Sequence, residues 1–126
     1  MAKTIATLLG AVLLLVGIIG FVNHDFLGTH LNGTHNAVHI ISGALSLYFG
    51  LAGSLSGARM FCLVFGIVYA LLGICGFLLG TGAERMLRID DLLMLGTMDH
   101  IVHILLGVLY LIGGFMTRAP VNAARD

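Results

Sequence analysis

The most prominent pattern along the chain is a set of four long apolar runs separated by polar segments. The runs cover about residues 4–22, 36–55, 60–79 and 98–116. Each is close to the roughly 20 apolar residues that a helix needs to cross the hydrocarbon of a bilayer. In lipid, every backbone N–H and C=O must be paired within the segment, which favours α-helix. The pattern therefore predicts four membrane-spanning helices.

The runs are related in pairs by an internal repeat. The pattern Gly-x6-Gly-x2-Gly-Phe begins at Gly10 and again at Gly66, and His-x3-Gly begins at His39 and again at His103. Each copy contains two runs, so both copies enter the membrane in the same direction. We expect an all-α integral membrane four-helix bundle in one transmembrane domain. It is made of two tandem helical hairpins, a parallel internal repeat with halves at about 1–57 and 58–118.

Each run also carries two glycines seven residues apart, a spacing that keeps them on one face of a helix in a left-handed pair. Small residues on such a face let helix backbones approach closely in lipid, and dispersion then holds them together. We expect tight packing at these pairs, which are Gly10 and Gly17, Gly43 and Gly50, Gly66 and Gly73, and Gly107 and Gly114.

The composition agrees with a membrane location. The 126 residues are 59% hydrophobic and only 10% charged, whereas soluble domains carry roughly 25% charged residues. A small soluble domain cannot bury so much apolar surface, which excludes a soluble enzyme. Six Lys and Arg balance six Asp and Glu, so no net field recruits a nucleic acid. The partner that the composition predicts is the lipid bilayer.

The basic residues suggest an orientation. Most of them lie on the side of the termini and the middle connection, namely Lys3, Arg59, Arg118 and Arg125. The positive-inside rule makes this side cytoplasmic, in the inner membrane of a bacterium. The outer connections are then about residues 23–34, where His24 and His30 are expected to be exposed, and about residues 81–97. In the second connection we expect a short amphipathic helix on the outer surface.

The polar residues of interest lie where the second and fourth runs begin. His35 and His39 are four residues apart in one run, and Asp99 and His103 are four apart in the other. Residues at i and i+4 share a helix face, and the repeat places His39 opposite His103. We therefore expect three imidazoles and one carboxylate to converge below the outer surface, with His100 to the side.

Three interpretations of this cluster stay open. Polar pairs commonly hold membrane helices together, so the cluster can be a latch in which Asp99 accepts a hydrogen bond from an imidazole. Imidazoles with one carboxylate also suit a transition metal, with His35, His39, Asp99 and His103 as ligands and His100 as a weaker one. In the third interpretation, His39 and His103 are axial ligands of a haem or another tetrapyrrole. Tyr48, Tyr69 and Tyr110 are interpreted as packing or interface residues.

Three groups of residues together resemble the pattern of a known family. They are Gly17-Ile-Ile-Gly20-Phe21, then His35-Asn36-Ala-Val-His39 with Gly43, and finally Asp99 with His103 and Gly107. The combination is similar to domain of unknown function 4383, a group of small bacterial four-span membrane proteins, over about residues 4–116. His100 stands where the family pattern has Asn. The resemblance implies the four-span architecture and supplies no activity.

No catalytic signature such as Gly-x-Ser-x-Gly, a phosphate loop or His-Glu-x-x-His occurs in the sequence. We therefore expect a non-enzymatic membrane protein. Its predicted role is that of a small accessory or assembly subunit, which packs against a larger membrane complex or self-associates, with the His/Asp cluster as a latch. The alternative is a metal- or haem-binding membrane protein that uses the same cluster.

Overall fold

The computed structural model describes residues 1–118, and most of them lie in four α-helices. The helices are α1 (Ala2–Ile19), α2 (Gly33–Leu51), α3 (Leu55–Leu79) and α4 (Thr97–Met116). The connections contain a 3-10 turn, η1 (Phe26–Gly28), and two strands, β1 (Leu87–Ile89) and β2 (Leu93–Leu95). Arg125, which entered the orientation argument, lies outside the described residues.

Polar caps set the helix starts, which differ by a few residues from the ends of the apolar runs. The Asn32 side chain accepts a hydrogen bond from the His35 backbone N–H at 2.8 Å, and α2 begins directly after it. Ser54 accepts in the same way from the Gly57 N–H at 3.0 Å, at the start of α3. Such caps satisfy N–H groups that the first helical turn leaves free.

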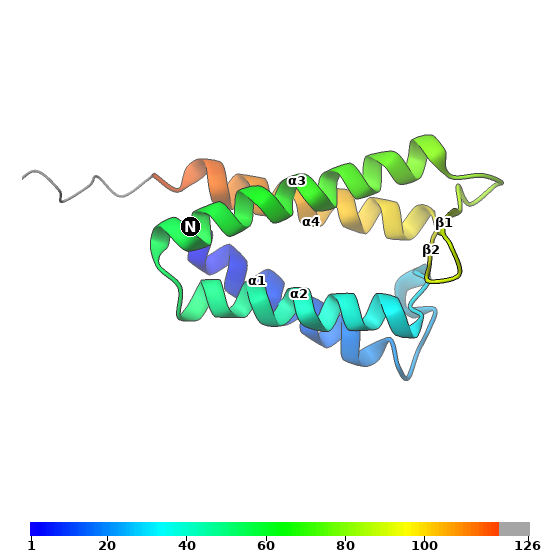
Figure 1. The fold of residues 1–126 in the computed structure, drawn as a ribbon, viewed down its shortest axis with the longest axis horizontal. Helices are drawn as coiled ribbons and strands as arrows, with labels where there is room; N and C mark the ends of the chain where they lie inside the picture. Colours follow the sequence, from blue (N-terminus) through cyan, green and yellow to red (C-terminus); the bar gives the residue numbers. More distant parts are fainter. Residues whose placement is uncertain (119–126) are drawn as a thin grey trace, which may run out of the picture.

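The helices form two antiparallel pairs that face each other (Figure 1). α1 packs along α2 and α3 along α4, and the fewer contacts between the pairs involve mostly α1. The connections with η1 and the two strands lie at one end of the bundle, here called the loop end. The N-terminus and the α2–α3 connection lie at the other end, where the Ala2 N–H donates to the Thr117 hydroxyl at 2.7 Å.

The distribution of polar and apolar residues indicates a membrane protein. α1, α3 and α4 are long and apolar enough to cross a bilayer. α2 is less apolar because it carries His35, Asn36 and His39, and all three are buried inside the bundle. Large apolar side chains on every helix are exposed instead, among them Leu8, Ile41, Ile67 and Leu105. Polar groups inside and apolar groups outside are what a lipid solvent requires.

The paired glycines lie where helix backbones meet, which confirms the prediction from their spacing. A Cβ atom on Gly43 would lie 2.7 Å from the Leu14 nitrogen, and one on Gly107 would lie 2.5 Å from the Ala70 nitrogen. The other paired glycines face the neighbouring helix in the same way, namely Gly10, Gly17, Gly50, Gly66, Gly73 and Gly114. Each helix pair is therefore held by direct backbone packing.

The predicted amphipathic helix before α4 is wrong, because this segment forms an antiparallel β-hairpin. The apolar residues of β1 and β2 lie opposite one another, Leu87 with Leu95 and Ile89 with Leu93. Asp90 turns the chain with a φ of 47°, which a right-handed helix does not contain and which Asp adopts more readily than most residues. In a strand, successive side chains point to opposite faces, a period of two. The prediction of a helix relied on the number of apolar residues in the segment and did not consider this period.

Gly43→Ala is expected to destabilise the protein by about 1–3 kcal/mol, because the added methyl group overpacks the contact between α2 and α1. Gly33→Ala is the matched control, since a Cβ at this position of the same helix meets nothing within 4 Å. Unfolding of both variants in detergent, followed by circular dichroism, measures the difference. Identical unfolding curves of the two variants would contradict close packing of α2 against α1 at Gly43.

Candidate metal centre

Three imidazoles meet in the core of the bundle near the loop end. His35 and His39 come from α2 and His103 from α4, and one ring nitrogen of each lies within 4.8 Å of the others. The ring centroids are 4.2 Å apart for His35 and His39, and 6.4 Å apart for His39 and His103. All three residues are buried. The structure thus brings together three of the four residues that the sequence placed in the cluster.

Each of the three rings keeps a nitrogen without a partner. The His35 Nδ1 lies 2.7 Å from the His30 carbonyl oxygen, so Nδ1 carries the proton and Nε2 has a free lone pair. This Nε2 and the Nδ1 atoms of His39 and His103 are buried and have no hydrogen-bond partner among the described residues. Buried polar atoms are normally paired, and in lipid an unpaired one costs more. A cation bound by one nitrogen of each ring would supply a partner that the bundle does not.

A cavity of about 40 Å³ lies beside the rings. Its walls are the three histidines, Tyr69 from α3 and the apolar residues Val38, Leu72, Leu93 and Leu95. One water needs about 10–15 Å³ of such space, so the cavity suits a metal ion with a small ligand. It does not fit a tetrapyrrole macrocycle, which argues against the haem interpretation.

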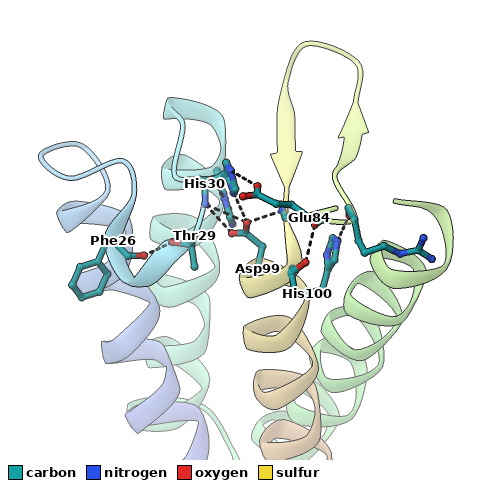
Figure 2. A network of polar contacts seen from close by, with 10 residues as sticks. Phe26, Thr29, His30, Glu84, Asp99 and His100 are labelled. Carbon is teal, nitrogen blue, oxygen red and sulfur yellow. Dashed lines mark hydrogen bonds and ion pairs between the residues drawn. The ribbon is translucent and has the colours of Figure 1, made fainter. Parts of the chain in front are cut away.

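Asp99 does not join the three histidines, so this part of the predicted cluster is wrong. Its buried carboxylate accepts hydrogen bonds from the Gly96 N–H at 2.8 Å and from the His30 N–H at 3.2 Å (Figure 2). The His30 ring Nδ1 is a further 3.1 Å neighbour. Asp99 is the third residue of α4, where free N–H groups and the helix dipole favour a carboxylate. These donors hold it at the loop end.

His30 has a structural role that the sequence prediction of an exposed loop residue missed. Its ring lies between Asp99 and Glu84, whose Oε2 is 3.7 Å from the His30 Nε2 (Figure 2). Its carbonyl oxygen accepts the hydrogen bond from His35. No local pattern encodes a contact between residues 69 positions apart. His24, by contrast, is exposed as predicted.

His100, the weaker candidate ligand, is not part of the three-histidine group. The residue is buried, and its Nε2 donates a hydrogen bond to the Arg85 carbonyl oxygen at 2.8 Å (Figure 2). Its ring lies edge-on to Phe77 at 5.1 Å and packs against Gly76 of α3. These contacts assign His100 to packing and to anchoring the loop end.

Tyr69 is a second residue whose position the sequence did not reveal. Its ring packs against the His103 ring, with centroids 5.6 Å apart, and the residue lines the cavity. The hydroxyl is buried and lacks a hydrogen-bond partner among the described residues. Ser42 on α2 is close to it but outside hydrogen-bonding geometry. A tyrosine in an apolar run resembles any packing residue, so only the tertiary contact distinguishes it.

The sequence model of domain of unknown function 4383 (DUF4383) matches residues 3–116. The chain belongs to this family. The match includes all four helices and the three histidines of the buried group, and it agrees with the resemblance noted in the sequence. The family description assigns no activity to DUF4383. No curated protein and no solved structure matches the chain.

In this DUF4383 chain, Asp99→Asn is expected to destabilise the fold by about 1–3 kcal/mol, because charge-assisted hydrogen bonds to buried N–H groups are lost. Asp91→Asn, at an exposed position of the β-hairpin, is the control. Unfolding in detergent and hydrogen exchange at the His30 amide measure the effect. Unchanged protection of that amide in Asp99→Asn would show that the bond to His30 contributes nothing.

Proposed function

We propose that this protein is an integral membrane protein that holds one divalent transition-metal ion between α2 and α4. The observation that carries the proposal is the buried group of His35, His39 and His103. One ring nitrogen of each lies within 4.8 Å of the others, and each ring has a buried nitrogen without a hydrogen-bond partner among the described residues. Ligands about 2.0–2.1 Å from a tetrahedral metal are roughly 3.3 Å apart. Binding therefore requires the ring nitrogens to approach one another, for example by rotation of the side chains. Neutral imidazole suits zinc, copper, iron and nickel.

The hydrogen bond of His35 supports a metal-binding role. A metal-binding histidine usually donates its other ring N–H to a carbonyl or carboxylate, which fixes the ring and its tautomer. His35 donates to the His30 carbonyl, and Asp99 holds His30 in turn. The predicted latch between α2 and α4 is not confirmed, because Asp99 contacts His30 and Gly96 instead of a residue of α2. The Asp99 carboxylate joins the α1–α2 connection to α4, and through His30 it would help to orient His35 as a ligand.

We infer that all four helices cross the membrane as two tandem hairpins. The glycine contacts support this inference, because they recur at equivalent positions. Gly10 faces the Leu47 nitrogen on α2, and Gly66 faces the Leu111 nitrogen on α4. The two glycines are 56 positions apart and the two leucines 64, which are the spacings of the sequence repeat.

Equivalent residues of the two proposed hairpins also meet across the bundle. His39 faces His103, and the Ser46 Oγ lies 2.8 Å from the Tyr110 hydroxyl. Both pairs are 64 positions apart. Contact between equivalent positions is what an axis of approximate twofold symmetry along the membrane normal produces.

The membrane and the orientation follow from the same proposal. α2 hides its polar residues in the bundle and exposes apolar side chains such as Ile41 and Leu45, so it can cross despite its lower hydropathy. The Lys and Arg balance favours cytoplasmic ends in a bacterial inner membrane, which places the metal site near the outer surface. The accessory-subunit role stays a prediction, since no contact in the structure favours it.

Removing a ligand is expected to weaken metal binding strongly. The chelator-stripped protein in detergent should bind one equivalent of Co²⁺ or Zn²⁺, measured by elemental analysis after dialysis. His39→Ala and His103→Ala should each lose more affinity than the roughly 10–100-fold that loss of an outer hydrogen-bond partner costs. His24→Ala, in an exposed loop, is the control. A wild-type protein that binds no metal, or equal losses in all three variants, would end the proposal.

Single cysteines on both sides of α2 test whether this helix crosses the membrane. In a background without Cys62 and Cys75, Asp25→Cys is expected to react with an impermeant maleimide outside intact spheroplasts. Ser56→Cys, at the other end of α2, should react only after permeabilisation. Both native positions are exposed, so burial does not limit labelling. Reaction of both from the same side would contradict the crossing of α2.

A further inference from the structure

The three-histidine group leaves one coordination position open, and this inference rests on the proposed metal site. A tetrahedral ion has four positions, and structural zinc sites fill all four with protein ligands. Among residues 1–118, only His35, His39 and His103 form a group of potential ligands. The Asp99 carboxylate accepts hydrogen bonds from the backbone N–H groups of His30 and Gly96 and is not part of this group. No fourth ligand of this kind lies among the described residues, so the open position is available to a ligand from outside them.

The cavity beside the rings provides the space for such a ligand. Apart from the three imidazoles, its walls are four apolar side chains and Tyr69. The Tyr69 hydroxyl is the wall group that can donate a hydrogen bond, and it has no partner among the described residues. Tyr69 is only 4% exposed, so leaving this hydroxyl unpaired is costly. Leu93 and Leu95 of the β-hairpin close the cavity on the side of the loop end.

Charge selects the kind of ligand. Three neutral imidazoles leave a divalent ion with its full charge inside an apolar bundle, where an unpaired charge is expensive. A monovalent anion halves the net charge of the divalent ion and its ligands, whereas a neutral ligand leaves that charge unchanged. The volume of about 40 Å³ limits the anion to about three heavy atoms.

We propose that the open position binds a small monovalent anion, such as hydroxide or a linear triatomic anion, which accepts a hydrogen bond from the Tyr69 hydroxyl. Tyr69 thereby becomes a positioning residue of the site. The small volume and the apolar walls exclude larger and multiply charged anions, because nothing in the cavity replaces their water shell.

The experiment uses the full chain loaded with Co²⁺, whose visible spectrum reports on its ligands, and azide as the probe. The wild-type spectrum is expected to change to saturation as azide is added. Tyr69→Phe removes only the hydroxyl, so it should keep the Co²⁺ stoichiometry but bind azide about tenfold or more weakly, since hydrogen bonds to charged groups are the stronger ones. Tyr110→Phe is the matched control, because this buried tyrosine does not line the cavity.

The outcomes separate the two proposals. If the wild-type protein binds no Co²⁺, the proposed function itself fails. If Co²⁺ binds in one equivalent but azide leaves the spectrum unchanged, the metal site stands and the open position is overturned. If Tyr69→Phe and Tyr110→Phe bind azide as tightly as the wild type, the assignment of Tyr69 is overturned. Stoichiometric Co²⁺ in both variants establishes that they are folded.

Discussion

The structure depends on backbone contact at the glycines within each helix pair. In lipid, the transfer of apolar side chains from water no longer drives helices together, so close approach and dispersion must do so. A Cβ at Gly43 or Gly107 would lie within 2.7 Å of a backbone nitrogen of the neighbouring helix. This constraint pairs α1 with α2 and α3 with α4, and it leaves larger side chains to fill the space between the pairs.

The side chains between the pairs are aromatic and polar, and this explains where the histidine group lies. Phe49 of α2 stacks on Phe61 of α3 with centroids 5.1 Å apart, and Tyr69 stacks on Tyr110 of α4 at 6.2 Å. Toward the loop end the same layer continues into the imidazoles. α2 and α4 therefore meet through their side chains. This spacing leaves room for an ion between them, whereas direct contact of the two backbones would leave none.

The loop end fixes one side of this group through charge and hydrogen bonding. Asp99 is buried among N–H donors, and it holds the chain segment whose carbonyl orients the His35 ring. The Asn32 side chain donates to the Leu92 carbonyl at 2.8 Å and joins the start of α2 to the β-hairpin. Residues from both long connections thus cover the three-histidine group, although each connection alone has little regular structure.

The sequence by itself determined the helical runs, the glycine seams and the convergence of His35, His39 and His103, because each follows from local periodicity and from the requirement that lipid places on the backbone. Only the tertiary structure decided the surroundings of those imidazoles. The partner of Asp99, the part played by His30, the β-hairpin and the position of Tyr69 depend on contacts between distant segments. A buried polar group such as the Asp99 carboxylate forms hydrogen bonds with the donors that the fold brings nearest to it. The spacing of residues along the chain does not reveal which donors these are.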